Sequence, residues 1–239
     1  MRERFIEPLA IEPDLVDRAY GAILDAICDG ALPAGTRLTQ EELALRLGVS
    51  RQPVMQALLL LRKQGFVCEA GRRGVMVAGL EPERVLQLYQ IRGVLDGLAA
   101  HGAATLGAAE AKRRGPAIIA AGRRAVQSRA IAAMTAADMA FHQLLYALSG
   151  NPLIADALAL HWRHIRRVMS AVLRRERVAL RVWDEHAAIL AAVIAGNAAE
   201  AERLSRAHAE VSARALAAAL AEGKTSATDD EAQRQRRTQ

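Results

Sequence analysis

Residues 32–67 read LPAGTRLTQEELALRLGVSRQPVMQALLLLRKQGFV, and this stretch decides the fold of the first third of the chain. Thr39 stands three positions before Glu42, which is the spacing of a capping box, so we expect a helix to begin there and to end at the next glycine. Ser50 can cap a second helix, which tolerates Pro53 in its first turn because no N–H partner is needed there. Two helices joined by so tight a turn are typical of a helix-turn-helix.

The segments on either side complete a winged helix-turn-helix. Apolar residues at helical spacing predict an earlier helix within 14–30, and we expect LPAGTRL to form a turn after it. Beyond Gly65, the stretch FVCEAGRRGVMVAGL predicts two short strands joined around residues 71–74, which would be the wing.

The second helix of the motif is the candidate reader of DNA. Its apolar positions, Val54, Ala57 and Leu58, would face inward, which leaves its polar positions outside. Residues 46–80 carry six basic side chains and one acidic side chain, so positive charge gathers on this segment. Arginine can pair with guanine and glutamine with adenine, while a serine at a helix start can hold phosphate. The candidate DNA-binding residues are Ser50, Arg51, Gln52, Gln56, Arg72, Arg73 and Gly74. The alternative is a small helical domain whose arginines are only solvated.

The rest of the chain is predicted to be helical. Periodicity and turn residues predict helices over 82–105, 108–127, 130–148, 151–175, 178–195 and 198–221, with Gly115-Pro116 interrupting or delaying the second of these. The fold class is therefore mainly α, an N-terminal winged helix-turn-helix followed by an all-α helical bundle. We expect an N-terminal arm (1–12), a DNA-binding domain (13–80), an all-α effector-binding and dimerisation domain (81–222), and a disordered polar tail (223–239).

Composition limits the class of protein. Hydrophobic residues make up 52% of the 239 residues and aromatic residues only 3%, which favours a helical globular protein. No apolar run approaches the roughly 20 residues of a membrane helix, so we expect no membrane partner. The two cysteines, Cys28 and Cys68, have no metal-type spacing and no export signal is evident, so a cytoplasmic location is expected.

Four polar residues of the helical region are predicted to point inward. Asp138 and His142 are four apart and share one helix face with apolar neighbours, while His186 and His208 each lie on an apolar stripe. A single histidine of this kind is usually a hydrogen-bonded core residue. Four such residues in one bundle favour a divalent metal site, and the ligand types suit zinc first, with nickel, iron or manganese as alternatives.

The first domain resembles the DNA-binding domain of GntR-family transcription regulators. The resemblance covers about 60 residues and includes the family signature SR-x-PV-x-x-AL, here beginning at Ser50 and Arg51. Members commonly carry arginine where this chain has Met55, and often threonine at Gln52. The loss of a cation at 55 implies an atypical operator.

The second domain resembles the FCD ligand-binding domain of the FadR subfamily, and six helices rather than seven would place it nearer the VanR-like group. The resemblance implies that Asp138, His142, His186 and His208 hold a metal to which a small carboxylate adds. It also implies that Arg92, in LYQIRGVLD, faces this cavity and binds the effector. The spacing of Arg92 from its apolar neighbours leaves a surface arginine as an equal alternative.

The leading hypothesis is a homodimeric transcription regulator, acting as a repressor, that binds double-stranded operator DNA under the control of a small organic or sugar acid. One alternative is a metal-dependent, hydrolase-like enzyme, against which the sequence has no HExxH motif and no phosphate-binding glycine loop. A further alternative is a DNA-binding protein without any small-molecule effector.

Overall fold

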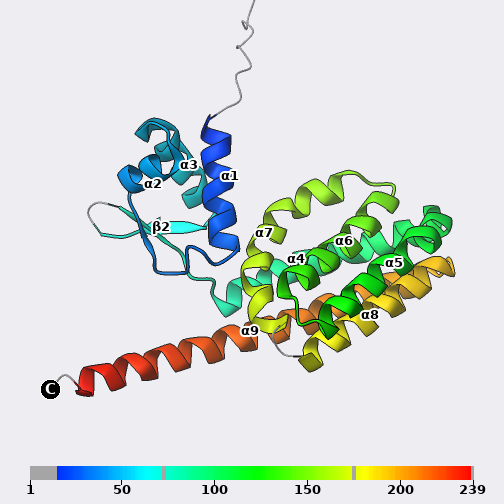
Figure 1. The fold of residues 1–239 in the computed structure, drawn as a ribbon. Coiled ribbons are helices and arrows are strands. Elements are labelled where there is room, and N and C mark those ends of the chain that lie inside the picture. The colour runs from blue at the N-terminus through cyan, green and yellow to red at the C-terminus, as the bar shows by residue number, and fades with distance from the viewer. Residues whose placement is uncertain (1–14, 72–73, 174–175, 238–239) are drawn as a thin grey trace, which may run out of the picture. The chain divides into compact units, whose positions relative to one another are not determined.

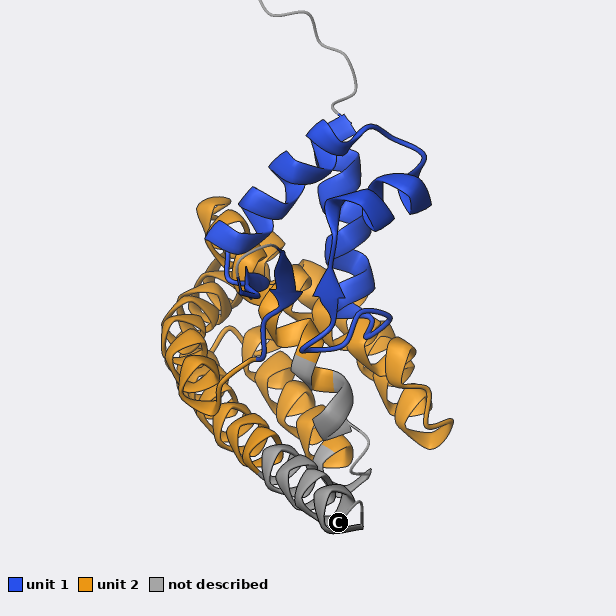
Figure 2. Cartoon of the chain, turned by 90° about the vertical axis from the view of Figure 1, so that its left-hand side faces the viewer, with its two compact units in different colours: residues 1–79 blue, residues 80–239 orange. Residues whose placement is uncertain are grey.

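The computed structural model describes residues 15–71, 74–173 and 176–237, with side chains described up to residue 221 except at 168 and 170–178. The chain forms two compact units, residues 1–79 and 80–239 (Figure 2). The expected fold class is confirmed, because a small unit with a three-stranded sheet is followed by an all-helical one (Figure 1). The expected arm (1–12) and the wing residues Arg72 and Arg73 lie outside the described residues.

The first unit follows the expected order of elements, with one addition. Its elements are α1 (Leu15–Cys28), β1 (Arg37–Leu38), α2 (Gln40–Leu47), α3 (Arg51–Lys63), β2 (Val67–Glu69) and β3 (Val75–Val77). The strands pair antiparallel in the order β1-β3-β2. The segment LPAGTRL was expected to be a turn only, but its last two residues form β1, because β3 offers them a free edge to pair with.

The caps around α2 explain the tight turn. The hydroxyl of Thr39 accepts a hydrogen bond from the backbone N–H of Glu42 at 3.2 Å, as the sequence predicts. The carboxylate of Glu42 pairs with Arg46 at 2.8 Å. Gly48 ends the helix with a φ of +65°, a conformation that favours glycine. Ser50 is the N-cap of α3, although its side chain makes no capping hydrogen bond.

The second unit is a bundle of six helices over its described residues. They are α4 (Pro82–Leu106), α5 (Ala108–Gln127), α6 (Ile131–Leu148), α7 (Leu153–Leu173), α8 (Glu176–Ile194) and α9 (Ala198–Arg237). Helix α4 packs along α9, and α5 packs against both α6 and α8 (Figure 1). None of the described helices is long and apolar enough to cross a membrane.

Two helices differ from the prediction. Helix α5 runs through Pro116 without a break, so the expected interruption is wrong. The proline leaves one carbonyl of the preceding turn without its usual N–H, and the remaining hydrogen bonds carry the helix on. Helix α9 continues to Arg237, fifteen residues past the expected end of the domain at 222. The stretch 223–230 that the helix crosses reads GKTSATDD, which consists mostly of weak helix formers, so helix propensity does not account for the extension.

A glycine brings α5 and α8 close together beneath the polar centre of the bundle. A Cβ atom added to Gly122 would lie 2.1 Å from the ring of Trp183, so only glycine leaves room for this side chain. The Trp183 ring in turn meets His186 edge-on, with 5.0 Å between the ring centroids. Packing between two helices therefore fixes one of the predicted metal ligands.

Candidate metal centre and nucleic-acid interface

Three histidines from three helices meet inside the second unit. His142 lies on α6, His186 on α8 and His208 on α9, and all three are buried. One ring nitrogen from each lies within 4.8 Å of the others, a separation that a single metal ion can bridge. Phe141, the neighbour of His142, stacks on the His186 ring at 4.2 Å and closes one side of the group.

Asp138 lies beside this group. Its Oδ1 is 3.6 Å from Nε2 of His186, and its Oδ2, although buried, has no hydrogen-bond partner among the described residues. Burial raises the pKa of this carboxyl, partly offset by the nearby charge of Arg92. The structure thus gathers the three predicted histidines and places the predicted carboxylate next to one of them.

The site accommodates a metal chemically. Burial lowers the pKa of His142 and of His186 well below the usual value, and for His142 the nearby Arg92 acts in the same direction. Both rings are therefore neutral at pH 7, which is the form that binds a metal. Nδ1 of His186 and Oδ2 of Asp138 are buried atoms without a partner in the described part of the chain. Imidazole and carboxylate donors of this kind suit zinc, nickel, iron or manganese.

Arg92 is buried at the centre of the site, so the alternative of a surface arginine is wrong. Its side chain is 2% exposed. Its Nε donates to Oδ2 of Asp96 at 3.0 Å, and its Nη2 lies 2.7 Å from Nε2 of His142. The guanidinium also lies 4.2 Å from the ring of Trp162 and 4.9 Å from that of Tyr89, which are cation–π distances.

Asp96 is a residue of the candidate site that the sequence reasoning missed. The carboxylate is completely buried and accepts a second hydrogen bond, from the hydroxyl of Tyr146 at 2.5 Å. Trp162 donates its indole N–H to the same hydroxyl at 3.2 Å. The available signal was the spacing of Arg92 and Asp96, which are four apart on one helix and opposite in charge.

Glu185 is the other residue missed. Its Oε2 lies 2.7 Å from Nδ1 of His208, and its Oε1 lies 3.3 Å from Nε of Arg181. Metal-binding histidines commonly use their second nitrogen in this way, because a carboxylate then fixes the orientation of the ring. Glu185 directly precedes His186 in the sequence, and neighbouring side chains on a helix point in different directions. Because His186 was expected to face inward, helical periodicity did not predict that Glu185 would also reach the site.

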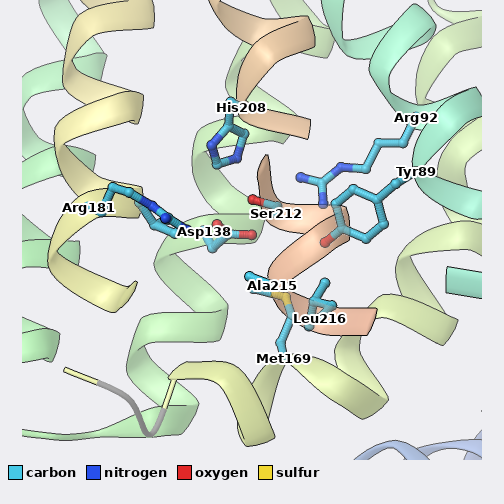
Figure 3. A pocket seen from close by; sticks show the side chains of 10 residues that line it. Tyr89, Arg92, Asp138, Met169, Arg181, His208, Ser212, Ala215 and Leu216 are labelled. Carbon is cyan, nitrogen blue, oxygen red and sulfur yellow. The ribbon is translucent and has the colours of Figure 1, made fainter. Parts of the chain in front are cut away.

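A small cavity opens beside Asp138 and His208 (Figure 3). Its volume is about 30 Å³, room for about two water molecules. The figure shows Arg92 and Tyr89 of α4 facing Asp138 of α6 and His208 of α9 across it. The lining residues are Tyr89, Arg92, Asp138, Met169, Arg181, Val182, His208, Ser212, Ala215 and Leu216.

The first unit presents a polar helix face to solvent. Ser50, Arg51, Gln52 and Gln56 are all exposed, while the apolar side of α3 is buried. Arg51 forms an exposed ion pair with Glu41 of α2 at 2.7 Å.

Two further positions flank this face. Gly74, one of the two described residues of the predicted wing tip, is exposed and has a φ of +134°, which favours glycine. Met55, the departure from the family pattern, is 41% exposed on α3. An apolar side chain therefore lies among the polar residues that were expected to face DNA.

Comparison with known families agrees with both units. Residues 15–77 match the bacterial regulatory proteins of the gntR family, and residues 87–211 match the FCD domain, which alone spans more than half of the chain. The chain belongs to the GntR family of bacterial transcription regulators. The family is not one of enzymes, so the alternative of a metal-dependent hydrolase is set aside.

Relatives support the same assignment. This chain is similar to an HTH-type transcriptional regulator of Streptomyces ambofaciens. The two are 31% identical over 183 residues, which are 74% of each chain. A regulator of Agrobacterium vitis is 34% identical over 85 residues, which are 36% of this chain and 50% of that protein. The chain thus matches only half the length of this relative.

A solved structure shares the fold. A GntR-type regulator from Rhodococcus sp. RHA1 superposes with a TM-score of 0.70 over 84% of this chain and 96% of that one, at 24% identity. At this level of identity the likeness concerns the fold alone.

Proposed function

We propose that this GntR-family protein is a cytoplasmic, DNA-binding transcription regulator whose affinity for double-stranded operator DNA is set by a small organic or sugar acid bound near a metal. The observation that carries the DNA-binding part is the exposed polar face of α3, formed by Ser50, Arg51, Gln52 and Gln56. In a helix-turn-helix these positions meet base edges and phosphates in the major groove. Arg72, Arg73 and Gly74 of the wing would add contacts to the backbone or the minor groove.

The test of DNA binding is fluorescence anisotropy with an operator selected from a random pool. Arg51→Ala should weaken binding by about 1–3 kcal/mol, because one base or phosphate contact is lost. Arg113→Ala is the matched control, since it removes an exposed arginine from α5 in the other unit. Equal operator affinities for the two variants would refute the assignment of Arg51.

We further propose that Asp138, His142, His186 and His208 hold a divalent metal, with zinc the first choice and nickel, iron or manganese as alternatives. When bound, the metal would supply a positive centre that attracts a carboxylate oxygen. His142 and His186 offer neutral ring nitrogens, His208 offers a third ring nitrogen, and Glu185 orients the ring of His208.

The effector would be a small carboxylate. Arg92 lines the cavity, and a guanidinium binds a carboxylate through two parallel hydrogen bonds. The cavity holds about two water molecules, so an acid of several carbon atoms has to displace Arg181, whose side chain is 46% exposed at its edge. Small acids are therefore favoured over bulky ones.

A panel of small organic and sugar acids, tested by melting temperature with and without a chelator, examines this sensing role. A ligand of the folded state raises the melting temperature by mass action. A shift that one acid causes and the chelator abolishes supports the metal-dependent sensor. If no acid shifts the melting temperature and operator binding stays indifferent to all of them, the alternative of a regulator without effector holds.

We propose that two copies pair and that the dimer acts as a repressor. Ile91, Val94 and Leu98 stand at helical spacing on the outer side of α4 and are 50%, 51% and 47% exposed. Such a row of aliphatic side chains supports burial against a second copy. Val94→Glu should shift the protein to monomers in light scattering after size exclusion. The same experiment on Leu153→Glu, an exposed leucine at the start of α7, controls for the added charge.

Control of repression by the effector would follow from a population shift. A dimer reads two half-sites, and the effector changes operator affinity only by as much as it prefers one arrangement of the two DNA-binding units. A promoter fusion measures the sign, because deletion of a repressor raises transcription.

A further inference from the structure

The contact between Arg92 and His142 fixes which nitrogen of the histidine carries a proton. Nη2 of Arg92 lies 2.7 Å from Nε2 of His142. A guanidinium has hydrogen-bond donors and no acceptor. Nε2 of His142 must therefore accept with its lone pair, and the proton of this neutral ring is on Nδ1.

The other side of the ring agrees with this assignment. Nδ1 of His142 makes no hydrogen bond within the described residues, but it lies 3.4 Å from Oδ2 of Asp96, and a carboxylate at that distance favours an N–H over a lone pair on the facing nitrogen. Metal-binding histidines commonly turn one N–H to a carboxylate and offer the other nitrogen to the metal. Nε2 is thus the nitrogen of His142 that is left for a metal. In the structure the lone pair of Nε2 accepts from the guanidinium of Arg92 instead.

We propose that Arg92 and a divalent metal ion are alternative partners of Nε2 of His142. This inference rests on the metal site proposed above. One lone pair cannot serve both, and two cations sharing one buried position would repel each other strongly. Asp96 can go on accepting from Nε of Arg92 while Nη2 of Arg92 turns away from His142, because the hydroxyl of Tyr146 fixes the carboxylate by donating to its other oxygen.

The exchange gives the site an order of events. In the structure, Nη2 of Arg92 is engaged by His142. Metal binding releases this nitrogen into the cavity that Arg92 already lines, where it can meet an anion. Metal binding thereby makes Arg92 available to the effector, so the two ligands bind with positive cooperativity.

The experiment is a zinc titration of the full-length protein against a chromophoric chelator. Arg92→Met removes the competing guanidinium but keeps an unbranched side chain between Trp162 and Tyr89. We expect it to bind zinc at least tenfold more tightly than the wild type. Loss of a merely structural arginine would weaken zinc binding or leave it unchanged, so a gain in affinity excludes that role, and the crystal structure described below separates competition for Nε2 from the simple removal of a buried charge.

Two further variants make the result specific. Arg181→Met removes the same charge from the wall of the same cavity, yet Arg181 pairs with the carboxylate of Glu185 and not with a histidine. Its zinc affinity should stay within about twofold of the wild type, because a half-exposed charge is well screened. His142→Ala should lose tight zinc binding.

The outcomes separate the competition from the metal site itself. If Arg92→Met and the wild type bind zinc equally while His142→Ala binds it weakly, the metal site stands and the competition is wrong. An equal gain in Arg181→Met would also overturn it, since the effect would then be one of charge alone. If no form binds zinc tightly, the metal site and the competition both fail.

A crystal structure of the zinc-loaded wild type gives an answer even if Arg92→Met does not fold. We expect Nε of Arg92 still on Asp96 and Nη2 out of hydrogen-bond range of His142. Zinc bound with the Nη2 contact intact would overturn the proposal.

Discussion

Replacing Asp96 by Asn should sharply destabilise the helical unit. Asp96 is completely buried and forms an ion pair with Arg92, which is itself 2% exposed. The asparagine oxygen can still accept from Tyr146, so the loss falls on the pair with Arg92, whose charge would remain buried without its partner. Removing one partner of a buried ion pair costs about 3–5 kcal/mol. Asp184→Asn is a matched control, because Asp184 pairs with Arg123 at 3.0 Å and is 73% exposed. Its loss should be under about 1 kcal/mol.

Urea unfolding followed by tryptophan fluorescence measures this difference in the right part of the chain. Both tryptophans, Trp162 and Trp183, belong to the second unit, so the signal reports on the helical bundle alone. A loss of about 3 kcal/mol or more in Asp96→Asn, with little change in Asp184→Asn, is the expected result. Equal, small losses in the two variants would show that the buried pair does not stabilise the bundle.

Three other perturbations test the bundle. Gly122→Ala should lower its stability by about 1–3 kcal/mol through overpacking, since the added Cβ would lie 2.1 Å from the Trp183 ring; an unchanged melting temperature would contradict this packing. Burial lowers the pKa values of His142 and His186, so their contribution to stability is complete above pH 6.5 and is lost as pH falls towards the lower folded-state pKa. In chelator-treated protein the free energy of unfolding should fall from pH 7 to 5 by up to about 1.4 kcal/mol per pH unit for each histidine. The raised pKa of Asp138 acts in the opposite direction and offsets the contribution of one histidine. Equal urea midpoints at the two pH values would refute this pH dependence. Zinc at one hundred times its Kd should stabilise the fold by about 2.7 kcal/mol, and a chelator should reverse the rise in melting temperature.

Local sequence signals predicted the elements and the inward direction of the candidate metal ligands. The cap of Thr39 and the positive φ of Gly48 depend on a few neighbouring residues, so their signature is visible without a structure. His186 and His208 sit among apolar residues at helical spacing, and the helix turns them inward with their neighbours. The strand β1 escaped prediction because two residues are too few to display an alternating pattern.

The connections around Arg92 could not be predicted from spacing. Arg92 lies at the edge of an apolar stripe, where a long side chain can turn to either side, and only packing against Trp162 decides for the interior. The partners Tyr146 and His142 lie 50 residues from Asp96 and Arg92 respectively, on another helix. Contacts at that distance depend on how α4 and α6 cross, and neither sequence stretch contains that information.

Helix α4 carries residues of the proposed effector site and of the proposed dimer surface on one continuous helix. It begins at Pro82, three residues after the first unit ends, and spans 25 residues, a length of about 37 Å at 1.5 Å per residue. Arg92 and Asp96 point from it into the polar centre, while Ile91 and Val94 point to solvent. An α-helix resists bending over so short a distance, so a turn of α4 about its own axis would move the inner and outer side chains together. Effector binding at the proposed site and pairing of two copies would then be coupled directly through this one rigid helix.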